Sequence, residues 1–281
     1  MSIPFIKMHG CGNDYVYVDC FKTAVSDPEK LAISISDRHK GVGGDGLVLI
    51  CPSLIADAKM RMFNMDGSEG KMCGNAIRCV AKYLCDSNKV LGNELTIETL
   101  SGIKKLTVFK KSGVVDKVTV DMGMASIEPK SLPITSLTPM IGEKYAVSGV
   151  EYKINCISMG NPHCVVFVPD PYRFDVENVG KAFEFDSLFP ERVNTEFVSV
   201  TGKNELTMRV WERGSGETLA CGTGACAAAY AAILNGFCTA GEDITVRLRG
   251  GDLTIRCEDT RVYMTGEAVK VFEGVYYEDR T

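Results

Sequence analysis

The chain has 281 residues, of which 45% are hydrophobic and 24% charged, a balance typical of a globular protein that can bury its own core. The net charge is −5 and no basic run interleaves with aromatic residues, so a nucleic-acid partner is not expected. No stretch approaches the length of an apolar membrane span, and residues 1–4 do not begin like a secretory signal, so no membrane partner is expected either.

Twelve cysteines are a high count for a chain of this length. Many of them lie inside apolar runs, where a free cysteine acts as a small hydrophobic side chain, as at Cys79, Cys85, Cys156, Cys164 and Cys226. This placement favours a reducing cytoplasm over a secreted disulfide framework. No Cys-x-x-Cys or His-x-x-x-His pair is present, so the sequence predicts no structural zinc site and no other metal site.

The first part of the chain predicts strands separated by two helices. Asp27-Pro28 is a typical helix start, because aspartate caps the first turn and proline suits its first position. The glycine-rich segment 41–46 predicts a turn before the next strand. The expected strands lie within 5–19, 47–50, 59–64, 94–99, 104–110 and 114–122, and the expected helices span 28–38 and 75–86.

A connector rich in proline, serine and threonine at 126–140 separates this set from a second one. The second set predicts strands within 152–168, 195–200, 205–211, 244–249, 253–257 and 261–264, with helices at 176–184 and 222–235. Because the same order of strands and helices occurs twice, we expect two similar halves.

One cysteine in each half lies at the same place relative to its surroundings. Cys73 and Cys221, each followed by glycine and a helix-forming run, are separated by 148 positions (221 − 73). The same separation joins Asn13 to Asn161 and Asn64 to Glu212. The matching spacing indicates a duplicated unit that presents one thiol per copy.

The helix after each cysteine lacks a full polar face. Residues 225–234 are apolar all round and mostly alanine, and 76–85 differ only by Arg78 and Lys82. A helix without a polar face is buried on every side. We therefore predict an α+β fold with two pseudo-symmetric halves, each a mainly antiparallel β-sheet wrapped around a central helix.

A thiol at the start of a helix has distinctive chemistry. The unpaired backbone N–H groups and the positive end of the helix dipole lower the pKa of such a thiol and can bind a carboxylate. Gly74 and Gly222 would let a ligand approach the backbone closely. Two such helix starts facing each other would hold one carboxylate between two thiols. Removal of a proton from one face of a carbon and its return on the other face is the chemistry of stereoinversion.

Several long motifs resemble those of diaminopimelate epimerases. They are Gly12-Asn13-Asp14, Phe63-Asn64-Met65-Asp66-Gly67-Ser68-Glu69, Cys73-Gly74-Asn75, Gly160-Asn161-Pro162-His163, Asn194-Thr195-Glu196-Phe197, Glu212-Arg213-Gly214 and Cys221-Gly222-Thr223-Gly224. The resemblance implies interconversion of LL- and meso-diaminopimelate without pyridoxal phosphate or metal, in the supply of lysine and cell-wall precursors. It also implies an N-terminal half of residues 1–122 with a returning strand at 267–281, a C-terminal half of residues 123–266, and an active site in the cleft between them.

The resemblance assigns roles by position. Cys73 and Cys221 would be the two acid/base thiols, with His163 and Glu212 assisting their ionisation and holding the substrate ammonium. The backbone at Gly74-Asn75 and Gly222-Thr223 would bind the reacting carboxylate. The distal end of the substrate would contact Arg213, Asn64, Asn161 and Asn194, and Asn13 would line the site.

One position departs from the pattern, because many family members have glutamine where this chain has Gly46. Two alternatives stay open on the sequence. One is a related cofactor-independent racemase of proline, hydroxyproline or histidine, and the other is a thiol oxidoreductase with Cys73 and Cys221 as its redox pair. The expected partner is a small-molecule amino acid. The resemblance allows a homodimer, although no residue pattern sets the oligomeric state.

Overall fold

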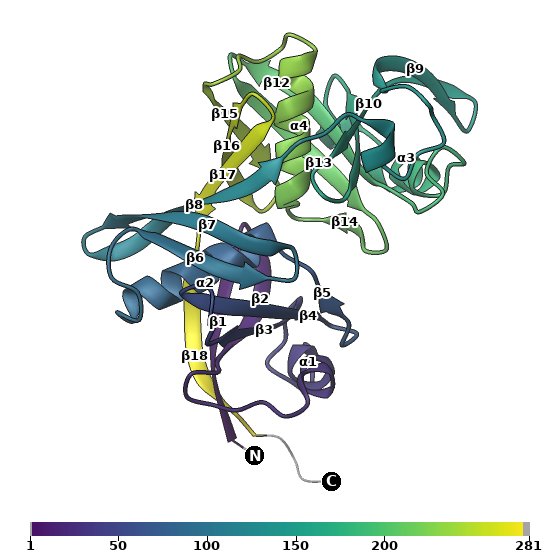
Figure 1. Ribbon diagram of the computed structural model, residues 1–281. Helices are drawn as coiled ribbons and strands as arrows, with labels where there is room; N and C mark the ends of the chain where they lie inside the picture. Colours follow the sequence, from purple (N-terminus) through teal and green to yellow (C-terminus); the bar gives the residue numbers. More distant parts are fainter. Residues whose placement is uncertain (1, 278–281) are drawn as a thin grey trace. The chain divides into compact units, whose positions relative to one another are not determined.

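The computed structural model describes residues 2–277, which form two compact units (Figure 1). Unit 1 contains the residues up to Val120 together with those from Gly266 onward, and unit 2 is Asp121–Thr265. The chain therefore leaves unit 1 once and returns to it near its C-terminal end. No helix among the described residues is long and apolar enough to cross a membrane.

Unit 1 is built from a mainly antiparallel set of strands. Taken from neighbour to neighbour, these are β18 (Val269–Tyr277), β1 (Ser2–Gly10), β2 (Asn13–Asp19), β3 (Gly46–Cys51), β4 (Ala58–Asn64), β6 (Glu94–Thr99), β7 (Gly102–Lys111) and β8 (Val114–Met124). Only the β2–β3 and β4–β6 pairs are parallel. The short β5 (Glu69–Gly70) pairs with β4, and the helices are α1 (Pro28–Ser36) and α2 (Gly74–Asp86).

Unit 2 has the same order of strands, except that its outermost strand comes from the start of the unit, whereas that of unit 1 comes from the end of the chain. Its strands, again from neighbour to neighbour, are β9 (Ile141–Val147), β10 (Val150–Ser158), β11 (Pro162–Phe167), β12 (Asn194–Gly202), β13 (Glu205–Glu212), β15 (Asp243–Leu248), β16 (Gly251–Glu258) and β17 (Arg261–Glu267). Here β11–β12 and β13–β15 are the parallel pairs. The short β14 (Gly216–Thr218) pairs with β13, and the helices are α3 (Val176–Glu184) and α4 (Gly222–Leu234).

The strand register repeats along with the strand order. Tyr15 pairs with Gly46 in unit 1, and His163 pairs with Asn194 at the corresponding point of unit 2. Both residues of the second pair lie 148 positions after those of the first (163 − 15 and 194 − 46). The predicted duplication and the predicted α+β fold class are therefore confirmed.

Each central helix is almost entirely buried. In α4 the buried side chains are mainly alanine, and the helix contacts strands β10 to β13, β15 and β16 of its own unit (Figure 1). Small side chains let strands approach a helix from several directions at once. In α2, Arg78 and Lys82 are buried with the apolar residues, so the absence of a full polar face did indicate burial on all sides.

The differences from the predicted elements are short strands and element ends. The sequence did not predict β5, β9 or β14, because two or three paired residues carry no periodic pattern and β9 is largely exposed. Helix α1 ends at Ser36, because Asp37 adopts an extended conformation. Of the predicted returning strand 267–281, β18 covers Val269–Tyr277 and pairs antiparallel with β1, while 278–281 lie outside the described residues.

Cys79 on α2 makes the stability of the protein depend on pH above the neutral range. Burial raises the pKa of its thiol to about 11. Ionisation therefore favours the unfolded chain, and stability present below the ordinary thiol pKa is lost as the pH rises toward 11. Between pH 8 and pH 10, we expect the unfolding free energy to fall by roughly 1 kcal/mol more in the wild-type protein than in Cys79→Ala. Urea titrations at the two pH values measure this difference, and equal slopes would contradict it.

Candidate functional site

Cys73 in unit 1 is surrounded by two of the predicted binding residues. It caps α2, and its sulfur accepts a hydrogen bond from the Ala76 amide at 3.5 Å. The thiol donates to Oδ1 of Asn13 at 3.3 Å, and Nδ2 of Asn75 donates to the same oxygen at 3.5 Å. The structure thus brings Asn13, Cys73 and Asn75 together at the start of a buried helix.

A network of charged side chains fixes the orientation of the Asn13 amide. Its Nδ2 donates to Asp45 Oδ2 at 2.7 Å, and because a carboxylate accepts only, the amide oxygen must face Cys73. Arg38 bridges Asp45 and Asp14 at 2.9 and 2.8 Å. The buried Lys7 lies 2.5 Å from the other oxygen of Asp14, and the pKa of Asp14 is lowered despite its partial burial, through its bonds to Arg38 and Lys7.

Arg78 supports the same helix start from within the core. Its side chain is fully buried, and its guanidinium donates to Oδ1 of Asn75 at 3.0 Å and to the carbonyl of Gly74 at 3.1 Å. It also donates to the carbonyl of Glu267 at 3.2 Å, so the returning C-terminal segment takes part in holding this turn. Arg78 is therefore a positioning residue for Gly74 and Asn75.

An arginine–glutamate pair stabilises the turn that precedes each cysteine, in the same way in both units. Arg61 pairs with Glu69 through two hydrogen bonds of 2.8 and 2.9 Å, and Arg209 pairs with Glu217 at 2.7 and 2.8 Å. Asn64 lies in the first of these turns, where it is exposed and donates to the Ser68 hydroxyl at 2.9 Å. Its side chain is thus held by the turn itself.

Cys221 in unit 2 lies at one end of a chain of hydrogen bonds. Its sulfur is 3.6 Å from the Thr223 hydroxyl, which accepts a hydrogen bond from Nδ2 of Asn161 at 3.4 Å. Oδ1 of Asn161 is 3.1 Å from Nε2 of the fully buried His163. Either the Thr223 hydroxyl or the Cys221 thiol can donate the hydrogen bond between them. The structure therefore links four predicted site residues in one unit.

The chain of hydrogen bonds continues to Glu196, which lies in the motif Asn194-Thr195-Glu196-Phe197 but was not predicted as a site residue. Its Oε1 lies 2.7 Å from Nδ1 of His163, and its side chain is fully buried. Its Oε2 has no hydrogen-bond partner among the described residues. Burial raises the pKa of Glu196, with the nearby His163 opposing the shift. The sequence did contain a signal for Glu196, since it is a carboxyl group in an otherwise apolar strand. Buried carboxyl groups are rare unless they are paired.

The pKa of Cys221 differs from the prediction. A thiol at a helix start was expected to have a lowered pKa, but the pKa of Cys221 is raised well above its ordinary value. Burial is the largest cause, and the negative charges of Glu212 and Glu196 add to it. The Thr223 hydroxyl and the Gly224 amide act in the opposite direction with smaller effect. Without a ligand, Cys221 is therefore a protonated thiol.

The remaining predicted residues of unit 2 lie at the ends of β12 and β13. The Arg213 amide donates to Oδ1 of Asn194 at 3.0 Å, and Nδ2 of Asn194 donates to the Pro162 carbonyl at 2.9 Å. The exposed Arg213 guanidinium donates to the Glu191 carbonyl at 3.0 Å, and the carboxylate of Glu212 accepts from Thr218 at 2.5 Å. Asn194 therefore sets the backbone at Arg213, while the guanidinium itself is solvent-accessible.

Gly46, the position that departs from the family pattern, corresponds to Asn194 by its place in the duplicated register. A Cβ atom at this position would overlap the carbonyl oxygen of Phe63 on the paired strand. The close approach of β3 and β4 in this chain therefore requires glycine, and a side chain could enter only if the two strands moved apart.

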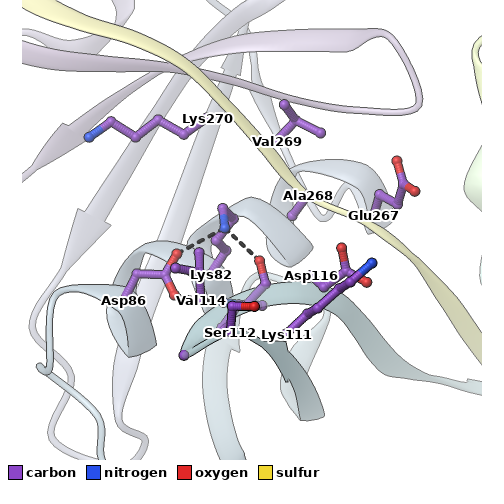
Figure 2. Close-up of a pocket in the computed structure, with 12 residues that line it drawn as sticks. Lys82, Asp86, Lys111, Ser112, Val114, Asp116, Glu267, Ala268, Val269 and Lys270 are labelled. Carbon is purple, nitrogen blue, oxygen red and sulfur yellow. Dashed lines mark hydrogen bonds and ion pairs between the residues drawn. The ribbon is translucent and has the colours of Figure 1, made fainter.

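Unit 1 also has a hollow of about 750 Å³ that contains none of the predicted site residues (Figure 2). It lies at the C-terminal part of α2, whereas Cys73 lies at the start of that helix. Figure 2 shows the Lys82 amine directed at Asp86, 2.9 Å away, and it also donates to the Val115 carbonyl at 2.5 Å. Both contacts hold the Lys82 amine within its own helix and the neighbouring strand β8.

Each unit thus presents one thiol at the start of a buried helix, next to amide groups that can bind a carboxylate. In unit 1 the thiol donates to an amide oxygen, and in unit 2 it is connected to a buried histidine and carboxyl. These thiols, together with groups that can bind a carboxylate, suit acid/base chemistry on an amino acid. That Cys73 and Cys221 meet at one substrate carbon stays a prediction.

Comparison with known proteins agrees with this chemistry. A family model described as diaminopimelate epimerase matches residues 5–128 and 155–271. The chain is 52% identical over 273 residues to a diaminopimelate epimerase of Acetivibrio thermocellus, covering 96% of this chain and 97% of the relative. It is 50% identical over 281 residues to a diaminopimelate epimerase of Geobacillus kaustophilus, covering 98% and 97%.

Solved structures with low sequence identity share the fold. A PhzF-family phenazine biosynthesis protein of Bacillus anthracis has a TM-score of 0.71 and 16% identity, and the match covers 98% of this chain and 99% of that chain. A hydroxyproline epimerase of Agrobacterium vitis has a TM-score of 0.69 and 14% identity, covering 98% and 90%. These similarities concern the fold alone.

Proposed function

The chain belongs to the diaminopimelate epimerase family, which makes it an isomerase, and we propose that it inverts LL-diaminopimelate to meso-diaminopimelate with two thiols as base and acid. The observation that carries the two-thiol mechanism is the repeat itself. Cys73 and Cys221 occupy the same position in two units of identical strand order, each as the cap of a buried helix. A reaction that treats the two faces of one carbon alike suits a duplicated site.

The protonation state of Cys221 indicates which thiol acts as the base and which as the acid when the LL isomer reacts. Because its pKa is raised, Cys221 holds its proton in the ligand-free protein. We therefore assign Cys221 as the acid that protonates the carbanion of the LL isomer, and Cys73 as the opposite base, which loses the proton it donates to Asn13 once substrate is bound and then removes the α-proton. The reverse reaction begins from the other protonation state. The mechanism requires the two thiols to lie on opposite sides of one substrate carbon.

The reacting carboxylate would bind the backbone amides of Gly74-Asn75 and Gly222-Thr223. This arrangement would also stabilise the negative charge that develops when the α-proton leaves. Glycine at the first position of each helix keeps the approach to these amides open.

The distal amino-acid end of the substrate would bind Arg213 together with Asn64, Asn161 and Asn194. Asn13 would line the site. The solvent-accessible guanidinium of Arg213 is suited to a carboxylate, and the asparagine amides offer both a donor and an acceptor to a zwitterion. His163 and Glu212 would hold the substrate ammonium and adjust thiol ionisation, and Glu196 would position His163.

We further propose that the enzyme acts in the cytoplasm, in the supply of lysine and peptidoglycan precursors, and needs neither metal nor pyridoxal phosphate. All twelve cysteines are free thiols, which suits a reducing compartment. Full activity after exhaustive dialysis against a chelator, with no absorbance beyond that of the protein, supports cofactor independence. Loss of activity that an added metal restores would contradict it.

A panel of substrates tests the proposed function. LL-diaminopimelate, lysine, histidine, proline and hydroxyproline are incubated separately with enzyme in deuterated water, and deuterium at the α-carbon is followed. We expect exchange and inversion with diaminopimelate alone, because only this substrate offers a second amino-acid end to Arg213 and the asparagines. Faster exchange on proline or histidine would favour a related racemase instead.

We also propose a homodimer, formed through the exposed face of β18. Val275 and Tyr277 lie on one face of this strand and are 46% and 73% exposed, and Val271, where the pairing with β1 shifts register, is 55% exposed. Exposed apolar side chains of this kind favour a contact surface. We expect a dimer in analytical ultracentrifugation and a monomer after Val275→Lys, because a buried lysine without a partner disfavours association. Val114→Lys, at an exposed valine on β8, is the matched control. A monomeric wild-type protein would contradict the proposal.

A further inference from the structure

Two cysteines outside the proposed site lie side by side at the ends of parallel strands. Asp19, the last residue of β2, pairs with Ile50 of β3, and Cys20 and Cys51 are the next residues along each strand. The amide of Cys20 donates to the Ile50 carbonyl at 2.9 Å, which continues the pairing of the two strands. Neighbouring strands in a sheet are about 4.8 Å apart, and the Cα atoms bridged by a disulfide are commonly separated by 4.4–6.8 Å.

Both thiols point to the same face of the sheet. Cys20 and Cys51 pack against the core that contains Leu47 and Leu49 of β3 and Leu31 of α1. Residues at matching positions of neighbouring strands bring these two side chains side by side, and both are partly exposed. The pair is therefore close enough to react together and is accessible to a small solute.

The strand next to Cys51 supplies positive charge. Lys59 of β4 is directly opposite Cys51, and Arg61 lies two residues further along on the same face. The pKa of Cys51 is lowered, first by the hydrogen bond from Cys20 and then by the charges of Arg61 and Lys59. The pKa of Cys20 is raised by the same hydrogen bond and by burial. Because Lys59 and Arg61 lie on the strand paired with Cys51, we assign Cys51 as the nucleophile of the pair.

We propose that Cys20 and Cys51 form a peroxide-reactive dithiol that closes to a disulfide between β2 and β3. The Cys51 thiolate attacks one oxygen of hydrogen peroxide, which breaks the O–O bond, forms a sulfenic acid and, with one proton, releases water. Cys20 then attacks the Cys51 sulfur, the S–S bond forms, and the sulfenic oxygen leaves as a second water. Two thiols lose two electrons in total, and one peroxide is reduced to two waters. The proposal does not depend on the activity of the enzyme.

A second pair of neighbouring thiols provides an internal comparison. In unit 2, Cys238 is partly exposed like Cys51, and Cys257 is buried. Burial raises the pKa of both, that of Cys257 to about 12, and no cation contributes. Because the thiolate is the species that attacks peroxide, Cys238 should react more slowly than Cys51.

Peptide mapping tests the proposal on the full-length protein. The reduced enzyme is exposed to hydrogen peroxide, free thiols are alkylated, and a tryptic digest is examined without reduction. We expect peptide 8–22 linked to peptide 41–59 through Cys20 and Cys51. We also expect Cys51 to be lost about tenfold faster than Cys238. Dithiothreitol should release the link, and Lys59→Met, in which the second peptide becomes 41–61, should slow its formation.

Two variants test whether Cys20 and Cys51 are the cysteines that form the link. Peptide 8–22 also contains the buried Cys11, so Cys20→Ser decides which cysteine is used. We expect no link in this variant and a sulfenic or sulfinic acid at Cys51 instead. In Cys51→Ser, Cys20 should stay reduced. A link that persists in Cys20→Ser, or loss of Cys238 as fast as loss of Cys51, would overturn the proposal.

Discussion

Replacing Cys73 or Cys221 with alanine is expected to lower kcat for inversion by about 10⁴-fold in either case. Each variant keeps one thiol, and inversion needs a proton acceptor on one face of the carbon and a donor on the other. Both cysteines cap buried helices, so circular dichroism should first show that the variants are folded. Cys238→Ala, at a partly exposed cysteine of unit 2, is the matched control and should keep full activity.

The two variants should differ in partial reactions, and this difference tests the assigned direction. If Cys73 is the base for the LL isomer, Cys221→Ala should still exchange the α-proton of that isomer with deuterated solvent without inverting it. Cys73→Ala should not exchange it, because Cys221 holds its proton and serves as the acid in that direction. The opposite pattern would reverse the two roles, and inversion at the wild-type rate in either variant would remove that thiol from the mechanism.

Glu196→Gln is expected to lower kcat by about 10²-fold with little change in KM. Glutamine has nearly the shape of glutamate and can still hydrogen-bond to Nδ1 of His163, but it cannot share a proton with the ring. The loss should therefore appear in the chemical step. Glu205→Gln, at a half-exposed strand position with one salt bridge, is the control and should leave kcat unchanged.

The pH profile distinguishes a positioning role of Glu196 from a purely structural one. Burial raises the pKa of Glu196, so its carboxyl takes up a proton at a higher pH than an ordinary glutamate does as the solution is acidified. We expect the wild-type enzyme to lose kcat on the acid side through this group. In Glu196→Gln, kcat should no longer fall on the acid side of the pH profile through this group. An unchanged acid limb together with an unchanged kcat would assign Glu196 to packing alone.

The two central helices could be predicted because their pattern is strong. Residues 225–234 lack any polar position, and a helix of that composition can only be buried. The duplication was equally accessible, because Cys73, Asn13 and Asn64 each have a counterpart at a constant separation. The strands were predicted less completely, because β5 and β14 are too short to show a periodic pattern.

The electrostatics of the site could not be predicted. The position of Cys221 at a helix start indicates a lowered pKa, but the shift depends on burial and on Glu212 and Glu196, which the fold brings near from other strands. The link from Glu196 to His163 likewise depends on the parallel pairing of β11 with β12. The contact between Cys20 and Cys51 arises from a parallel register that no local pattern encodes.

The central claim is that two thiols act on opposite faces of one carbon. The direct measurement is a reaction of the wild-type enzyme with protiated LL-diaminopimelate in deuterated water, stopped after a few per cent conversion and analysed by mass spectrometry. Two bases predict that the meso product carries one solvent deuterium at the inverted carbon while the recovered LL substrate stays protiated. Meso product that retains the original protium would show that one group removes and returns the same proton, and would contradict the two-thiol mechanism.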